Sequence, residues 1–365
     1  MLPIQIAVLP GDGIGTDVTR EALRVLHAVA PAHDLAFKFT EYSVGAAEFL
    51  RSGHPLPEAA LAGCAKADAI LLGAMGLPGV RWPDGKEMTP QIDLREKFQL
   101  YNGLRPIRLY HLQDSPLKLD QRPRPTTTSS PALAAAEPPA IDLLIVREST
   151  EGLFSARLSK TDADLGEVCD VMRITRAGSE RVCHAAFQQA RLRRRHCTLV
   201  DKANVLPSMV YLRSIFDAVA TQYPDVTTNH IYVDAAALYL VQRPWSFDVI
   251  VTENMFGDIL SDLAAGLIGG MGMAPSADIG DHHAVFQPSH GTAPDIAGLG
   301  IANPVAMILS AAMMLEWLAR PGTADAARRI HQAVARVLAD PTQRTPDTGG
   351  TLTTIGLTEL IIAGL

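Results

Sequence analysis

The sequence predicts a protein of the α/β class, and two observations support this prediction. Short apolar runs rich in Val, Ile and Leu recur along the 365 residues, and segments of helical length separate them. Runs of this kind are typical of buried strands in sheets that helices cover. Each run also ends abruptly at glycine or polar residues. The length allows two domains, or one large α/β unit with a divided core.

Six apolar runs are expected to form the buried strands. In α/β sheets the reactive groups gather just beyond the C-terminal ends of the strands, and here Lys, Arg or Asp repeatedly occupies that position. This regularity predicts a functional site at the strand ends. The runs are residues 4–10, 69–73, 141–146, 197–200, 230–233 and 247–251.

Charge and hydropathy argue against several classes of protein. A formal net charge of −7 and a pI near 5.9 argue against a nucleic-acid partner. The longest apolar stretch, 301–319, contains Asn303, Ser310 and Glu316, which favours a buried helix over a membrane span. No basic leader precedes the first apolar run, so a cytoplasmic protein without a membrane partner is expected. Four cysteines without metal-finger spacing are expected to be thiols: Cys64, Cys169, Cys183 and Cys197.

Two segments interrupt the alternation of strands and helices. "GDGIGT", 11–16, is not a dinucleotide fingerprint, because the third glycine would fall at Thr16 and no acidic residue follows about twenty residues later. A tight glycine turn from a strand into a helix accounts for it. Residues 113–139 are rich in Pro, Ser and Thr, and are expected to form a partly disordered surface loop.

Asp258 and Asp262 lie four residues apart in the otherwise apolar "FGDILSDLAAGL", 256–267. On a helix both carboxylates project from one face, where they repel each other. A solvated helix edge would explain the pair, and so would a divalent cation that turns the repulsion into coordination. The spacing alone favours the solvated edge.

Other charged residues also follow strands or precede helices. Guanidinium groups grip carboxylates through paired hydrogen bonds, so Arg95, Arg105 and Arg147 could hold a dicarboxylate, although surface ion pairs would explain any one of them. Lys202 is either a general base or an exposed lysine. Asp234 is either a metal ligand or a helix N-cap.

Residues 290–304, "HGTAPDIAGLGIANP", combine turn residues with His290, Asp295 and Asn303. Small residues there permit a ligand to approach the backbone closely, so a ligand loop is indicated. An ordinary Pro/Gly connection remains the alternative.

Taken together, these segments resemble the metal-dependent β-decarboxylating dehydrogenases, the family of 3-isopropylmalate, isocitrate, homoisocitrate and tartrate/D-malate dehydrogenases. The resemblance extends nearly from end to end of the chain, and the order of the motifs makes it specific. The motifs are "LPGDGIG", "LR" at 94–95, "NGLRP", "VRESTEG", "VDKANVL", "YVDAAALYLV", "TENMFGDILSDLAAGLIGG", "HGTAPDIAGLGIANP" and "ILSAAMMLEWL".

The resemblance implies roles for the residues singled out above. Asp258 and Asp262 would bind Mg²⁺ or Mn²⁺. Asp234 as third ligand and Lys202 as catalytic base would come from the other subunit, which implies a homodimer with shared active sites. Arg95, Arg105 and Arg147 would bind the carboxylates of a small 2-hydroxy dicarboxylate.

The resemblance also implies NAD as the cofactor. NADP-specific members can carry Lys-Tyr where this chain has Asp295-Ile296, and an aspartate there bonds the adenosine ribose and repels a 2′-phosphate. The matching adenosine-binding positions are expected to be cofactor-binding, with Asp347 nearby and Ile14 after the first glycine turn. They are His290, Gly291, Thr292, Ala293 and Asn303.

Two positions depart from the family pattern. Phe154 replaces the tyrosine that helps to protonate the enolate, and phenylalanine cannot donate a proton. Gln91 and Ile92 stand where an isopropylmalate enzyme would have two leucines facing the isopropyl group, so a smaller or more polar substituent is also compatible.

The expected fold is that of isopropylmalate and isocitrate dehydrogenases, with two α/β domains and the active site in the cleft between them. Residues 1–100 with 269–365 would form the cofactor-side domain, and residues 101–268 the substrate and dimerisation domain. The expected reaction is NAD-dependent oxidative decarboxylation of a 3-substituted malate, 3-isopropylmalate-like. The alternatives are a decarboxylating tartrate/D-malate dehydrogenase and a non-catalytic NAD-binding regulatory homologue.

Overall fold

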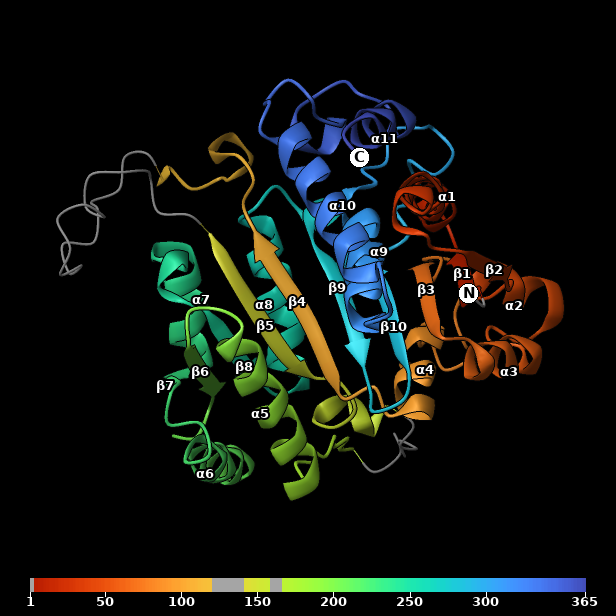
Figure 1. The fold of residues 1–365 in the computed structure, drawn as a ribbon. Helices are drawn as coiled ribbons and strands as arrows, with labels where there is room; N and C mark the ends of the chain where they lie inside the picture. Colours follow the sequence, from red (N-terminus) through yellow and green to blue (C-terminus); the bar gives the residue numbers. More distant parts are fainter. Residues whose placement is uncertain (1–2, 120–140, 158–165) are drawn as a thin grey trace, which may run out of the picture. The chain divides into compact units, whose positions relative to one another are not determined.

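The computed structural model describes residues 3–119, 141–157 and 166–365. The chain forms two compact units, which are described separately. Unit 1 comprises Met1–Leu100 and Gly269–Leu365, and unit 2 comprises Tyr101–Ile268. Both are of the α/β class, as predicted (Figure 1). Most of the Pro-rich loop predicted at 113–139 lies outside the described residues.

The strands of unit 1 lie in the order β2-β1-β3-β10-β9. Neighbouring strands are parallel except for the pair of β9 and β10, which is antiparallel. β3 is buried along its whole length, whereas β2 is a largely exposed edge strand. The strands are β1 (Ile4–Gly11), β2 (Phe37–Glu41), β3 (Ala69–Ala74), β9 (Pro275–Ile279) and β10 (Ala284–Pro288).

Helix α9 (Val305–Leu318) is the predicted apolar helix, and eleven of its fourteen residues are buried. It packs on β9, β10, α1 and α10. Within the described part of the chain, no helix is both long and apolar enough to span a membrane. The other helices of unit 1 are α1 (Ile14–Val29), α2 (Ala46–Ser52), α3 (Glu58–Lys66), α4 (Pro90–Phe98), α10 (Thr323–Leu338) and α11 (Thr354–Ala363).

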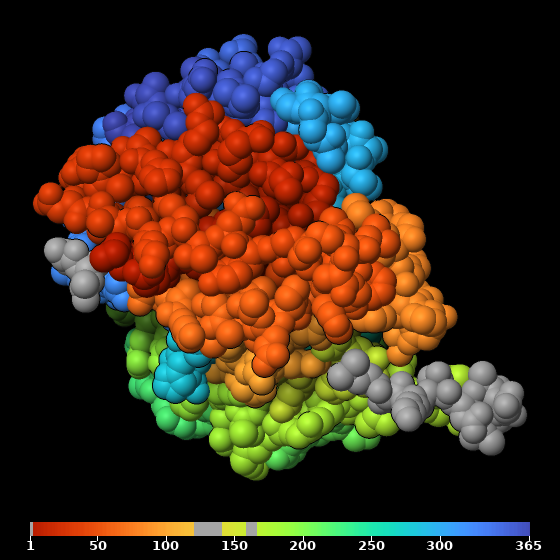
Figure 2. Space-filling view, turned by 90° about the vertical axis from the view of Figure 1, so that its right-hand side faces the viewer, coloured from red at the N-terminus to blue at the C-terminus, as the bar shows by residue number. Residues whose placement is uncertain are grey.

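The glycine turn after β1 is a tight, backbone-packed connection. Gly11 and Gly13 have φ angles of 74° and 56°, and a Cβ at either position would lie about 2 Å from a carbonyl oxygen of a neighbouring segment. Asp12, between them, is buried and accepts hydrogen bonds from the backbone of Ala46, Ala47 and Gly76. The turn therefore holds α2 and the end of β3 together. The red and orange surface in Figure 2 belongs to these N-terminal segments of unit 1.

Unit 2 contains the strand order β4-β5-β8-β6-β7. β4 and β5 are antiparallel, and the remaining pairs are parallel. The prediction of a buried strand at 230–233 was wrong, because β7 is an edge strand whose residues are mostly exposed. The strands are β4 (Asn102–Arg108), β5 (Asp142–Glu148), β6 (His196–Asp201), β7 (Thr227–Tyr232) and β8 (Val249–Thr252).

Two helices of unit 2 cover opposite faces of its sheet near the end of β5 (Figure 1). Successive side chains of a strand point to opposite faces. Arg147 of β5 contacts helix α8 (Asn254–Gly266), whereas its neighbour Glu148 lies 3.7 Å from Arg181 of helix α5 (Arg176–Arg191). The α8 face therefore carries the arginine predicted to bind substrate.

The remaining elements are the helices of unit 2 and several short 3₁₀ helices. The helices of unit 2 are α5 (Arg176–Arg191), α6 (Pro207–Ala220), α7 (Val233–Gln242) and α8 (Asn254–Gly266). The described 3₁₀ helices are Pro31–His33, Leu112–Asp114, Leu153–Ala156, Pro244–Ser246, Met271–Met273 and Pro346–Thr348.

Candidate active site

Helix α8 begins directly after β8 and carries the predicted pair of aspartates. Its N-cap is Glu253, whose buried carboxylate accepts hydrogen bonds from the backbone of Met255 and Phe256 at 3.0 and 2.6 Å. Such a cap satisfies amides that the first turn leaves without helical partners. Burial raises the pKa of Glu253. The segment that carries both aspartates therefore lies in a helix, Asn254–Gly266, and the Glu253 cap fixes its start.

Asp258 and Asp262 lie one turn apart on α8, and their side chains project from one face, as predicted. Partial desolvation raises the pKa of Asp262, and the negative charge of Asp258 raises it further. The nearby Arg105 and Arg147 act in the opposite direction. Two carboxylates and two guanidinium groups thus share this region of unit 2.

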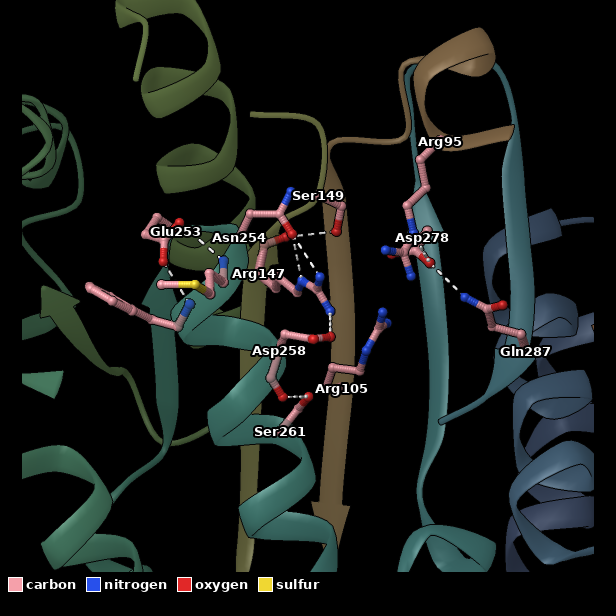
Figure 3. Close-up of polar contacts among 12 residues, drawn as sticks. Arg95, Arg105, Arg147, Ser149, Glu253, Asn254, Asp258, Ser261, Asp278 and Gln287 are labelled. Atoms are coloured by element: carbon pink, nitrogen blue, oxygen red, sulfur yellow. Dashed lines mark hydrogen bonds and ion pairs between the residues drawn. The ribbon is translucent and has the colours of Figure 1, made fainter. Parts of the chain in front are cut away.

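Arg147, the penultimate residue of β5, is 2% exposed and is held by the first turn of α8. Figure 3 shows its guanidinium pointing at Asn254 and Asp258. Its Nε and Nη2 both donate to Asn254 Oδ1, at 3.0 and 2.7 Å. Its Nη1 donates to Asp258 Oδ1. The arginine predicted to be functional is therefore a buried cation bound to a predicted metal ligand.

The aliphatic part of the Arg147 side chain packs closely against Gly257 of α8. A Cβ at Gly257 would lie 2.6 Å from the Cγ of Arg147, so only glycine leaves room for this side chain. The ring of Phe154 lies on the guanidinium, with 5.3 Å between the ring centroid and Cζ. A phenyl ring at this distance attracts the cation. Phe154 thus contacts the site although it lacks a hydroxyl group.

Arg105 projects from the same face of the sheet as Arg147. Gly103 of β4 is directly opposite Arg147, and Arg105 follows two residues later. Opposite residues of an antiparallel pair share a face, as do alternate residues along a strand. Arg105 is 4% exposed, and its Nη1 donates to the Leu104 carbonyl oxygen at 3.1 Å. The register of β4 and β5 therefore aligns both arginines toward α8.

Lys202 and Asp234 form a separate pair in unit 2. Lys202 follows β6 directly, and Asp234 is the second residue of α7, whose N-cap is Tyr232. The alternative that Asp234 is a helix N-cap was therefore wrong. Lys202 Nζ donates to Asp234 Oδ1 at 2.6 Å, and this hydrogen bond lowers the pKa of Asp234. Among the described residues, no three His, Cys, Asp or Glu side chains form a group that could hold a metal ion.

In unit 1, Arg95 is held by a buried polar network. Its Nε donates to Asp278 Oδ2 at 3.0 Å, and Gln287 Nε2 donates to the same oxygen at 2.8 Å (Figure 3). Asp278 lies on β9 and Gln287 on β10, and neither was singled out from the sequence. Because these groups are buried, the carboxylate fixes the direction of the Arg95 side chain.

Gln91 and Ile92 lie near the start of α4, and Gln91 is one helical turn before Arg95. Residues at this spacing are neighbours on a helix surface. Gln91 Oε1 is buried without a hydrogen-bond partner among the described residues. The helix therefore brings Gln91 to the same face as Arg95.

The predicted ligand loop of unit 1 packs against the glycine turn. Ile14 N donates to the Thr292 carbonyl oxygen at 2.8 Å, and Gly298 N donates to Asp17 Oδ2 at 2.9 Å. Ala293 has a φ angle of 35°, which is unusual for alanine, and Gly291 faces open space. Asp295 is exposed and Ile296 is partly buried. The loop is thus held in one conformation by the start of α1.

Two further residues of this region have buried polar groups. Asn303 Nδ2 donates to Asp347 Oδ2 at 3.0 Å, which brings together two residues predicted to lie near each other. His290 Nδ1 lies 2.8 Å from the Gly291 carbonyl oxygen. His290 Nε2 is buried and has no partner within the described residues. An unsatisfied buried nitrogen is costly, and a bound ligand would remove that cost.

The sequence of this chain matches the family model described as isocitrate/isopropylmalate dehydrogenase over residues 5–362. The chain belongs to this family. The 3-isopropylmalate dehydrogenase of Moorella thermoacetica is 46% identical over 352 residues, covering 94% of this chain and 92% of that protein. The 3-isopropylmalate dehydrogenase of Shouchella clausii is 44% identical over 342 residues, covering 92% and 89%.

Solved structures of the family have the same fold. The crystal structure of isocitrate dehydrogenase from Methylococcus capsulatus matches with a TM-score of 0.84 and 35% sequence identity, and the match covers 99% of each chain. This chain is therefore a member with the isopropylmalate/isocitrate dehydrogenase fold, as the sequence predicted.

His290 is partly exposed as a residue, but its Nε2 atom is buried, and this has a consequence for the pH dependence of stability. Burial lowers the pKa of His290, so the unfolded chain binds a proton more readily than the folded chain as the pH falls below about 6.5. Folding stability contributed by neutral His290 is therefore lost on acidification, at no more than about 1.4 kcal/mol per pH unit. We expect His290→Gln to lose less stability than the wild type between about pH 8 and pH 5.

Urea unfolding at several pH values measures this difference. The matched control is His54→Gln, because His54 is exposed. Its stability should follow the pH dependence of the wild type. Parallel curves for the wild type and His290→Gln would show that His290 does not bind protons differently in the folded chain.

Proposed function

We propose that this protein catalyses NAD-dependent and Mg²⁺- or Mn²⁺-dependent oxidative decarboxylation of a 3-substituted malate, 3-isopropylmalate-like. The main support for the proposal is the ion pair between Arg147 and Asp258 of α8, together with Arg105, which lies on the same face of the sheet as Arg147. This arrangement brings cations suited to a dicarboxylate next to carboxylates suited to a metal. Relatives that match nearly the whole chain are named 3-isopropylmalate dehydrogenases.

The side chains of α8 fit a divalent cation. Asp258 and Asp262 supply hard oxygen ligands from one helix face. Desolvation and the negative charge of Asp258 raise the pKa of Asp262, so a bound cation would relieve the repulsion between the two carboxylates. The proposed third ligand is Asp234 of a second copy of the chain. The bound metal would polarise the substrate carbonyl and stabilise the negative charge that develops when CO₂ leaves.

The loop of unit 1 fits the adenosine part of NAD. His290 has an unpartnered buried nitrogen, Gly291 leaves open space, and Asp295 offers an exposed carboxylate. A carboxylate suits ribose hydroxyls and would repel the 2′-phosphate of NADP. Ile14, Thr292, Ala293, Ile296, Asn303 and Asp347 would complete this site. NAD supplies the acceptor for the hydride that leaves C2 of the substrate.

The remaining tasks, which are substrate binding and proton transfer, would fall to residues of the chain. Arg95, Arg105 and Arg147 bind and orient the substrate carboxylates, and Lys202 takes the proton of the C2 hydroxyl group. Oxidation at C2 allows the carboxylate on C3 to leave as CO₂, because it is β to the new carbonyl and the electrons of the breaking C–C bond delocalise into that carbonyl. The resulting enolate needs a proton at C3. Phe154 cannot donate it, so another group or water must do so.

Gln91 favours a second candidate, a tartrate/D-malate dehydrogenase of the same reaction type. Its amide is polar where an isopropyl group would need an apolar wall, and its Oε1 is buried without a described partner. Ile92 retains an apolar side chain at the next position. Phe154 favours a third candidate, a non-catalytic NAD-binding homologue, although the three arginines, Lys202 and the three aspartates proposed for the site are all present.

NADH formation and CO₂ release, measured in parallel with Mn²⁺, test the proposed function. The acids to compare are 3-isopropylmalate, D-malate, tartrate and isocitrate. We expect equal amounts of NADH and CO₂ from one of the first three, because oxidation and decarboxylation occur in one site. NADH without CO₂ would mean that the reaction ends at oxidation, and a strong preference for isocitrate would contradict the proposal.

We also propose a homodimer with shared active sites. Apolar side chains on α7 and α8 are exposed in the single chain: Leu238, Val241 and Ile259 are 51%, 39% and 59% exposed. Exposed apolar groups gathered on two packed helices are typical of a protein interface. The pairing of Lys202 with Asp234, separate from the Asp258 pair, also supports contributions from two chains.

Mixing two inactive variants tests whether the sites are shared. In Lys202→Ala and Asp258→Asn homodimers every site lacks one essential group, so both should have very low activity. After unfolding and refolding of an equal mixture, about half of the dimers are mixed and each has one intact site. We expect the mixture to recover about a quarter of wild-type activity.

Refolding of each variant alone is the control, and mass spectrometry of the intact dimers verifies the mixing. If mixed dimers form and activity does not return, the sites are not shared. A protein that sediments as a monomer while active would contradict the dimer itself.

A further inference from the structure

We propose that Asn254 is a positioning residue for Arg147, and that its neutral amide holds the guanidinium without reducing the positive charge available to a substrate carboxylate. This inference deepens the proposed function and rests on it. Asn254 was not among the residues singled out from the sequence.

The hydrogen bonds between Asn254 and Arg147 fix the plane of the guanidinium group. Arg147 Nε and Nη2 converge on one oxygen, Asn254 Oδ1, at 3.0 and 2.7 Å (Figure 3). Two hydrogen bonds from adjacent nitrogens restrict rotation of the guanidinium about its side-chain axis. Nη1 points to Asp258. The direction in which Arg147 presents its charge is therefore set by the first turn of α8.

The orientation of the Asn254 amide is itself determined. Its side chain is buried, with the residue 1% exposed, and its Nδ2 donates to the Glu151 carbonyl oxygen at 2.9 Å. An amide turned by 180° would place NH₂ against the donors of Arg147 and oxygen against a carbonyl. The observed orientation is the one in which both ends are satisfied. Asn254 thus links Arg147 to the segment after β5.

Charge explains why an amide suits this position better than a carboxylate. Aspartate has nearly the same size and would accept the same two hydrogen bonds, but it would add a negative charge within 2.7–3.0 Å of the guanidinium. That charge would compete with an anionic substrate for Arg147. It would also lie one helical turn from Asp258, where like charges repel.

Gly257 supports the same geometry by a separate physical effect. Its missing side chain allows Arg147 Cγ to lie against α8, because a Cβ would come within 2.6 Å of that atom. Asn254 therefore orients the charged end of Arg147, while Gly257 accommodates its aliphatic part.

The test is substrate binding and steady-state kinetics of Asn254→Asp in the full-length protein with Mn²⁺ and NAD. We expect KM for the preferred acid to rise by about tenfold or more, with a smaller change in kcat, because ground-state binding of a carboxylate is weakened. The Kd of NADH, measured by fluorescence, should not change. The matched control is Asn229→Asp, which adds the same charge at β7, where Asn229 bonds Thr198. It should leave KM unchanged.

A double-mutant cycle separates positioning from a general structural role. Arg147→Lys removes the planar group that Asn254 orients. If Asn254 acts through Arg147, Asn254→Ala should raise KM in the wild-type background and have little further effect in Arg147→Lys. Equal effects of Asn254→Ala in both backgrounds would overturn the inference.

The two proposals fail in different ways. If the wild type binds NADH and Mn²⁺ but binds none of the acids in calorimetry, the proposed function fails and this inference fails with it. If the wild type binds an acid and Asn254→Asp binds it equally well, only the inference is overturned.

Discussion

The buried guanidinium of Arg147 is the constraint on which the rest of the site depends. A cation that is 2% exposed must have acceptors, because burying an unpaired charge costs several kcal/mol. The acceptors are on α8, so α8 must begin close to the end of β5. The Glu253 cap fixes that start, and the fixed start also sets the positions of Asp258 and Asp262. One buried charge thus determines where the predicted metal ligands lie.

In unit 1, Arg95 is likewise a buried arginine whose guanidinium is held by a polar acceptor. There the acceptor is Asp278, which also accepts from Gln287, and all three groups are buried. In both units an arginine is fixed by a helix or strand of its own unit before any substrate is bound. Charged groups held in this way need little reorganisation when a ligand arrives, which favours binding and catalysis. In the separate Lys202–Asp234 pair, by contrast, the Asp234 side chain is 70% exposed, so burial does not fix it in the same way.

The positions of several candidate residues could be predicted from the sequence because simple periodicities determine them, whereas the roles proposed for these residues came from the family resemblance. The spacing of Asp258 and Asp262 is that of one helix face, and Arg147 follows an apolar run that is a strand. The residues that hold the two arginines in place could not be predicted. Asn254 looks like an ordinary polar residue at a strand end, although its spacing of four from Asp258 was an available signal. Asp278 and Gln287 meet only through the antiparallel pairing of β9 and β10, which local sequence does not encode. The exposure of β7 follows from its place at the sheet edge.

Binding of Mn²⁺ to the protein, followed by electron paramagnetic resonance, tests the central claim most directly. The account predicts about one site per chain in the wild type. It also predicts loss of that site in both Asp258→Asn and Asp262→Asn, with wild-type binding in the exposed control Asp325→Asn. The stability of each variant in urea shows that it is folded. Undiminished Mn²⁺ binding by folded Asp258→Asn and Asp262→Asn would contradict the account.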